Sequence, residues 1–304
     1  MLAFDERRGK PENLHTVYGM EQIPSDTQMR AVLDDVEPES LRPVYKEVFR
    51  DAQRGKALEP YRIMGKYYLL SLDGAGYFSS NKIHCANCLV KKLRNGERLY
   101  HHQMLGAAII HPDLNTVIPL MPEPIIKQDG VKENDCERNA AKRFFKKLRQ
   151  DHPRLPLIIT EDALSSNAPH IKELNKHNLH FILGVKESDH AFLFEQVAQA
   201  REEGRSIEYE ITKNGVTHRF HFVNLVPLNA SNPDVLVNFL EYWAITEKGE
   251  RHFSWITDFR IERHNVYTLM RAGRARWKIE NETFNTLDLL HNKAGCHVSS
   301  NEAV

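Results

Sequence analysis

The amino-acid sequence predicts an α/β protein in which helices flank a mixed sheet, with an antiparallel β block inserted late in the chain. Two observations predict this class. Between residues 67 and 200, apolar runs of strand length alternate with stretches of helical period, in the order three strands, helix, strand, helix, strand. Between residues 201 and 257, apolar and polar residues alternate around turn signals, as in antiparallel hairpins. The predicted organisation is a helical N-terminal segment (1–66), the first part of the core (67–200), the inserted β subdomain (201–257), the C-terminal helix of the core (258–290) and a tail (291–304).

Two helices are expected in the N-terminal segment. Ser25 and Gln28 form a capping box, and Pro38 and Pro43 mark the start of the second helix. Apolar residues follow each start at helical spacing, namely Met29, Val32, Leu33 and Val36, and then Leu41, Val44, Tyr45, Val48 and Phe49. Both patterns are typical of amphipathic helices.

The first three strands of the core are expected to form a meander. Residues 67–73 are a short apolar run that ends in the lone carboxylate of Asp73, and Gly74-Ala75-Gly76 follows as a loop signal. Residues 100–111 and 116–121 flank a Pro-Asp turn signal. We therefore expect the first strand to stop at Asp73 and the next two to pair as a hairpin.

A crossover is predicted in the second half of the core. A helix is expected over about 134–150, with acidic residues at its start and basic residues at its end. Residues 155–160 form a strand that stops before Asp162, a helix starts near Asn167, and residues 180–185 form the next strand. Two strands joined through a helix in one sheet run parallel.

The inserted block and the end of the chain have different patterns. Two hairpins are predicted, one around Asn214-Gly215 and one around the turn at 247–250. After Asp258 the chain is expected to be helical as far as residue 290. The tail at 291–304 has no apolar period and is expected to be disordered.

Composition excludes several classes of protein. The chain has 304 residues, 41% of them hydrophobic, so it is not collagenous, mucin-like or wholly disordered. It contains no signal-like apolar start and no run near the roughly 18 apolar residues of a membrane span, which predicts a cytoplasmic protein without membrane contact. With 41 basic and 41 acidic residues the formal charge is zero, which taken alone argues against a nucleic-acid partner.

Two carboxylates follow predicted strands of the core. Asp73 ends the first strand and Asp162 follows the fourth, 89 positions later (162 − 73). Sites in open α/β sheets form at this edge, and facing carboxylates need a cation such as Mg²⁺ to stay ionised together. Each residue could alternatively be a turn former or a helix cap.

Five segments in order resemble the DDE transposases of bacterial insertion sequences. They are LDGAGYFSS (72–80), YHHQMLGAAIIHP (100–112), QDGVKENDCERNAAKRF (128–144), TEDALSSNAPHI (160–171) and GRARWKIENETFNTL (273–287). The likeness extends over nearly all of residues 3–287. It implies an RNase H-like fold whose three catalytic, metal-binding carboxylates are Asp73, Asp162 and, 118 positions later (280 − 162), Glu280.

The last segment resembles the family signature Tyr, two residues, Arg, three residues, Glu, six residues, Lys. Arg276 and Glu280 match the Arg and the Glu, whereas Gly273 and Leu287 replace the Tyr and the Lys. At i, i+4 spacing the guanidinium can hold a phosphate while the carboxylate holds the metal; a plain ion pair is the alternative. Compared with the family, the chain is expected to be truncated at both ends, since it stops 24 residues (304 − 280) after Glu280.

The resemblance implies DNA strand cleavage and strand transfer during transposition. Two Mg²⁺ ions, or Mn²⁺ in their place, would serve one phosphodiester at a time. The expected partners are transposon ends and target DNA, held by a homodimer in the bacterial cytoplasm at the nucleoid. Two alternatives stay open: an inactive remnant that only binds DNA, and a structure-selective nuclease that cuts without joining.

Local charge qualifies the argument from net charge. Residues 271–278 contain Arg271, Arg274, Arg276 and Lys278 and no acid, directly beside Glu280. A contact with the DNA backbone is expected for this cluster. Acidic residues elsewhere in the chain can offset such a basic surface in the sum.

The four cysteines are too few for a disulfide framework. Cys85 and Cys88, with His101 and His102 after a hairpin return, could form a structural zinc site, and free thiols in a loop are the alternative. Cys136 is expected to lie in a helix and to be buried in the core.

Overall fold

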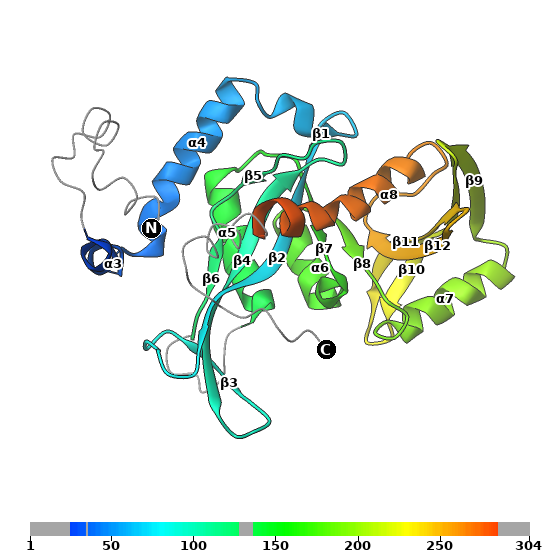
Figure 1. Cartoon of the computed structure of the whole chain (residues 1–304). Coiled ribbons are helices and arrows are strands. Elements are labelled where there is room, and N and C mark those ends of the chain that lie inside the picture. The colour runs from blue at the N-terminus through cyan, green and yellow to red at the C-terminus, as the bar shows by residue number, and fades with distance from the viewer. Residues whose placement is uncertain (1–24, 35, 128–135, 285–304) are drawn as a thin grey trace.

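The architecture is a large mixed sheet with helices on both faces. The structure is a computed structural model, and it describes residues 25–34, 36–127 and 136–284. Within this part of the chain, twelve strands form one sheet, whose main path has the order β3-β4-β2-β7-β8-β12-β11-β10-β9 (Figure 1). The predicted α/β class is therefore confirmed.

The strands are β1 (Arg62–Ile63), β2 (Tyr67–Ser80), β3 (Leu89–Lys92), β4 (Arg98–Ile110), β5 (Ile118–Pro119), β6 (Glu123–Ile125), β7 (Leu157–Glu161), β8 (His180–Gly184), β9 (Ile207–Lys213), β10 (Val216–Asn229), β11 (Asn232–Thr246) and β12 (Gly249–Thr257). The α-helices are α3 (Asp26–Asp34), α4 (Arg42–Arg54), α5 (Glu137–Asp151), α6 (Ala168–Lys176), α7 (Ala191–Glu202) and α8 (Val266–Arg274). Short 3-10 helices include η3 (Ala163–Ser165) and η4 (Ala275–Trp277), and the π-helix η5 (Ile279–Phe284) ends the described chain.

The central strands bury both faces because their side chains alternate. On β2, Leu70 and Leu72 belong to a core shared with α5, α6 and α7. Leu69 points to the other face and belongs to a second core shared with α8. Strand β2 runs antiparallel to β4 and parallel to β7, and β7 runs parallel to β8 as the predicted crossover requires. The site described below lies at the edge of the sheet where the parallel pairing of β2 with β7 ends.

Strand β2 is longer than predicted. The expectation that it stops at Asp73 is wrong, because the strand continues through the glycines to Ser80 and Asp73 pairs with Gly106 of β4. The loop signal failed because β4 supplies hydrogen bonds along this whole stretch. The predicted strand at 116–121 is shorter than expected: β5 lies within it and pairs with β4 as predicted, and a further short strand, β6, also pairs with β4.

The antiparallel block continues the central sheet. Both predicted hairpins are present, with Asn214 and Gly215 in the left-handed region at the first turn (φ 51° and 74°). Strand β12 pairs with β8, so β9 to β12 extend the sheet away from β2 (Figure 1). The predicted helix after Asp258 starts at Val266 and is broken into α8, η4 and η5. Its end, the tail at 291–304 and residues 1–24 lie outside the described residues.

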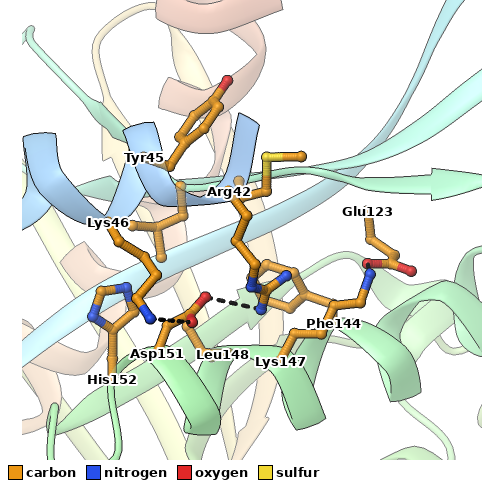
Figure 2. Close-up of a pocket in the computed structure, with 11 residues that line it drawn as sticks. Arg42, Tyr45, Lys46, Glu123, Phe144, Lys147, Leu148, Asp151 and His152 are labelled. Atoms are coloured by element: carbon orange, nitrogen blue, oxygen red, sulfur yellow. Dashed lines mark hydrogen bonds and ion pairs between the residues drawn. The ribbon is translucent and has the colours of Figure 1, made fainter. Parts of the chain in front are cut away.

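Helix α4 contacts α5 through ion pairs and through the buried side chain of Phe49. The predicted cap of α3 is present, since the Gln28 N–H donates to Ser25 Oγ at 3.1 Å. Most predicted apolar positions of α3 and α4 are exposed, including Val32 (60%) and Val48 (63%), whereas Phe49 is buried. Figure 2 shows Asp151 of α5 facing two cations of α4, at 2.8 Å from Arg42 and 3.3 Å from Lys46.

Every helix in the described ranges is too short or too polar to cross a membrane.

Candidate active site

Asp73 is placed by the alternation of β2. Leu69, Ser71 and Asp73 point to the face covered by α8, and the Ser71 hydroxyl donates to the Arg276 carbonyl at 3.2 Å. The parallel pairing of β2 with β7 ends at Ser71 and Thr160. Asp73 therefore lies just beyond the last paired residues, at the carboxyl end of the parallel strands, as the sequence predicted despite the error in strand length.

Asp162 follows the end of β7 and also caps a helix. Its Oδ1 accepts a hydrogen bond from the Leu164 N–H at 3.0 Å, at the start of η3. The alternative considered for this residue, a helix cap, is thus correct. The cap holds the carboxylate at the sheet edge.

Arg276 links the first and third predicted carboxylates. Its Nη1 lies 3.3 Å from Asp73 Oδ2 and 2.8 Å from Glu280 Oε1. The guanidinium is largely shielded from solvent, with 13% of its side chain exposed. The i, i+4 ion pair expected as an alternative is therefore present, and it is joined by a carboxylate that is 203 positions away (276 − 73).

Asp162 and Glu280 both lie close enough to Asp73 to affect its pKa. Burial raises the pKa of Asp73 to about 7, and a hydrogen bond with Glu280 and the charges of Glu280 and Asp162 act in the same direction. Arg276 opposes this increase in pKa but does not cancel it. The negative charge around Asp73 thus outweighs the compensation that Arg276 supplies.

The donor set suits a hard divalent cation, but the three carboxylates are not gathered around one point. Among the described residues, the trio of ligand atoms within 4.8 Å of one another is that of Cys85, Cys88 and His102, and the carboxylate oxygens are not gathered as closely. Oxygen donors and uncompensated negative charge are what Mg²⁺ binding requires. Binding of one cation by all three carboxylates would require them to move closer together, with Arg276 giving up its contacts with Asp73 and Glu280.

Two further carboxylates near this edge were missed by the sequence analysis. Glu137 begins α5, and burial first, then the charges of Asp162 and Glu161, raise its pKa. Glu161 ends β7 and points to the opposite face from Thr160, where its Oε2 lies 2.6 Å from His170 Nε2 of α6. The signal for Glu161 was its position directly before Asp162. That for Glu137 was its place as an acidic residue in the first turn of a predicted helix.

Gly74 leaves the space that Glu137 occupies, which gives a testable prediction. A Cβ at Gly74 would lie 2.1 Å from Glu137 Oε1, so Gly74→Ala must push the carboxylate aside. Because the clash is with the end of a flexible side chain, we expect a loss of about 1 kcal/mol in the free energy of unfolding. In a Glu137→Ala background the same substitution is expected to cost nothing.

Urea unfolding of the wild-type protein, the Gly74→Ala and Glu137→Ala variants and the double variant measures this coupling. Gly76→Ala is the matched control, because a Cβ there would lie 3.9 Å from its nearest neighbour, the His102 carbonyl oxygen. Additive effects of the Gly74 and Glu137 substitutions would contradict the contact.

The predicted DNA-contacting cations all have partners within the protein. Arg271 forms an ion pair with Asp113, and Lys278 Nζ donates to the Leu114 carbonyl at 2.6 Å. Arg274 lies over the Phe253 ring, 5.2 Å from its centroid. The side chains of Arg271, Arg274 and Lys278 thus connect the end of α8 and the residues after it to the turn after β4 and to β12. They line an open depression of about 630 Å³, on which a ligand would have to compete with these contacts.

Gly273 occupies the signature position where a tyrosine was expected. A Cβ at Gly273 would lie 2.6 Å from Trp255 Nε1 of β12. The indole therefore fills the space that a larger residue 273 would need.

The predicted zinc ligands are brought together only in part. Cys85, Cys88 and His102 form one cluster, whereas His101 is not in it, because adjacent residues of β4 point to opposite faces. Cys136 is exposed and precedes α5 as its N-cap, so the expectation that it lies in the core is wrong.

In comparisons of the sequence with known proteins, no protein-family model and no curated protein matches the chain.

Proposed function

We propose that this chain is a DDE-type transposase of a bacterial insertion sequence, with an RNase H-like core that cleaves and joins DNA. The observation that carries the proposal is the convergence of Asp73, Asp162 and Glu280 at one sheet edge, although 89 and 118 positions separate them in sequence. The raised pKa of Asp73 supports it, because strongly perturbed carboxylates are enriched at functional sites.

The topology of the core supports the same proposal. Strand β2, with Asp73, is central, with antiparallel β4 on one side and the parallel strands β7 and β8 on the other. The periodicity of the sequence predicted three strands, helix, strand, helix, strand along the chain, and the resemblance implies an RNase H-like core. The carboxyl ends of its parallel strands are the usual location of a site.

Each residue of the site has a chemical role in this proposal. When bound, Mg²⁺, or Mn²⁺ in its place, would activate a water or a 3′-hydroxyl and would stabilise the leaving oxygen. Asp73, Asp162 and Glu280 would hold the ions. Arg276 would exchange its contacts with Asp73 and Glu280 for a phosphate oxygen, since a guanidinium binds phosphate as well as carboxylate. The cations Arg271, Arg274 and Lys278 would then contact the neighbouring DNA backbone, at the expense of their present partners.

The test is a cleavage and strand-transfer assay on purified protein. The substrate is the DNA that flanks the gene, which would carry the element ends, with a supercoiled plasmid as target. We expect Mg²⁺-dependent cleavage and joining that is lost in Asp73→Ala, Asp162→Ala and Glu280→Gln. Asp234→Ala is the matched control, because this exposed carboxylate at the start of β11 pairs only with Lys172 at 3.3 Å among the described residues.

The outcomes separate the competing functions. Cleavage without joining would identify a structure-selective nuclease on the same site. Binding of DNA without cleavage by the unmodified chain would identify an inactive transposase remnant. Undiminished cleavage in all three carboxylate variants would show that the site lies elsewhere. Sedimentation with and without end DNA tests whether a homodimer forms on paired ends in the active complex.

A further inference from the structure

Two thiol sulfurs and one imidazole nitrogen meet at the far end of β2, away from the carboxylates. His102 Nε2 lies 3.3 Å from Cys85 Sγ and 3.3 Å from Cys88 Sγ, and the two sulfurs are 3.7 Å apart. The cysteines are in the loop between β2 and β3, and the histidine is on β4. Residues that are 14 to 17 positions apart are thus directed at one point.

The spacing of these atoms is that of a zinc coordination sphere. With Zn–S bonds of about 2.3 Å and a Zn–N bond of about 2.0 Å, tetrahedral angles place two sulfurs about 3.8 Å apart and sulfur and nitrogen about 3.5 Å apart. The observed 3.7 Å and 3.3 Å agree with these values to a few tenths of an ångström. A sulfur separation of 3.7 Å is far too long for a disulfide, which needs about 2.05 Å.

Local structure prepares the three ligands for this arrangement. Ala86 and Asn87 form a tight turn, closed by a hydrogen bond from the Cys88 N–H to the Cys85 carbonyl at 3.3 Å. The Cys85 N–H in turn donates to Cys88 Sγ at 3.3 Å, as backbone amides do around thiolate ligands. Cys88 is 1% exposed and anchors the turn, whereas Cys85 faces solvent.

His102 is oriented by the rings beside it. The register of β2 and β4 slips between Gly76 and Phe78, so that Tyr77 is an extra residue opposite β4. The slip lets the Tyr77 ring stack on His102, with centroids 5.8 Å apart and planes 14° apart. Phe78 packs at a tilt against the same imidazole, with centroids 5.7 Å apart. The imidazole edge that carries Nε2 is thereby turned toward the thiols.

We propose that Cys85, Cys88 and His102 bind one Zn²⁺ ion that fastens the loop between β2 and β3 to β4. Solvent completes the coordination sphere on the exposed side of Cys85. The role is structural, because the ion would connect two segments at the base of the β3–β4 hairpin. A set of two thiolates and an imidazole binds zinc in preference to Mg²⁺, because Mg²⁺ prefers oxygen ligands. The proposal does not depend on the function proposed above.

The decisive experiment is a zinc determination on full-length protein purified under reducing conditions without chelator. We expect about one zinc per chain by plasma mass spectrometry, falling at least tenfold in Cys85→Ser, Cys88→Ser and His102→Ala. Cys136→Ser and His101→Ala are the matched controls and should retain the metal, because neither residue belongs to the cluster. An Asp73→Ala, Asp162→Ala double variant should also retain it, which separates this site from the carboxylates.

Cobalt substitution identifies the ligands. Co²⁺ should give the intense visible bands of tetrahedral coordination and a thiolate charge-transfer band, both absent in Cys85→Ser. Because Cys85 is exposed, this variant tests the proposal even if Cys88→Ser does not fold. Zinc retained at wild-type level in Cys85→Ser, a zinc-supplemented wild-type chain without bound metal, or a Cys85–Cys88 disulfide found by mass spectrometry would each overturn the assignment.

Discussion

Asp73→Asn is expected to abolish DNA cleavage and, in chelator-treated protein at pH 8, to increase the free energy of unfolding by about 1 to 3 kcal/mol. The carboxyl lies in a partly buried position, with 23% of its side chain exposed, beside Glu280 and Asp162. A pKa of about 7 in place of the ordinary 3.8 corresponds to about 4 kcal/mol of unfavourable ionisation. Solvent screening and the lost pairing with Arg276 reduce this figure.

The sign of the pH dependence follows from the raised pKa. Between pH 3.8 and about 7 the folded protein binds this proton more tightly than the unfolded chain, so stability falls as the pH rises through that window. The asparagine variant lacks this proton equilibrium. The two proteins should therefore have nearly equal stability at pH 4, and the variant should be the more stable one at pH 8.

Urea unfolding at both pH values, with EDTA present, measures the effect. When EDTA is replaced by Mg²⁺, the wild-type protein should become more stable and the variant should not. The reason is that a bound cation neutralises the charge of the wild-type carboxylates. Asp234→Asn, with an exposed carboxylate, should show no such pH-dependent difference from wild type. A difference between Asp73→Asn and wild type that is the same at pH 4 and pH 8 would contradict the proximity of the carboxylates.

Strand positions were predicted well where one face or both faces of the strand are buried. They were predicted poorly where hydrogen bonds from a neighbouring strand determine how far a strand extends. The hydrophobic runs of β7 and β8 predicted their parallel pairing. Gly74 and Gly76 were read as a loop, because the hydrogen bonds that β4 supplies cannot be seen in a local pattern. The same glycines have a reason in the fold, since Gly74 admits the Glu137 carboxylate.

The candidate site shows the same division between local and long-range information. The i, i+4 spacing of Arg276 and Glu280 predicted their ion pair, but not that Asp73 joins it. The zinc prediction named His101 and His102 together, because sequence alone does not show which of two neighbours on β4 faces the thiols. The register slip at Tyr77, which brings its ring onto His102, has no signature in the sequence.

Glu161→Ala is expected to be the most destabilising single substitution at this edge of the sheet, by about 3 to 5 kcal/mol. Glu161 and His170 are 5% and 3% exposed at the side chain and lie 2.6 Å apart. The Ser165 hydroxyl also donates to the carboxylate, at 3.1 Å. Removing the carboxylate leaves a buried imidazole and a hydroxyl without their partner, which costs far more than the loss of an exposed pair.

Helix α6 provides the matched control for this prediction. Glu173 pairs with His177 at 3.0 Å through the same chemical groups, but its side chain is 18% exposed and it lies one turn from the helix end. Glu173→Ala should therefore cost about 1 kcal/mol or less. Equal costs for the two substitutions in urea unfolding would show that burial does not strengthen the dependence of His170 on Glu161.

The pH dependence of the cost separates an ion pair from simple packing. Burial acts to lower the pKa of His170, but the charge and the hydrogen bond of Glu161 outweigh it and raise the pKa above 6.5. The stabilisation by the protonated imidazole is therefore complete below pH 6.5 and is lost as the pH rises through the raised value. Glu161→Ala should cost more at pH 6 than at pH 9, whereas a loss of packing alone would cost the same at both. Since Glu161 directly precedes Asp162, the pair would also fix the end of β7 from which the second carboxylate of the site projects.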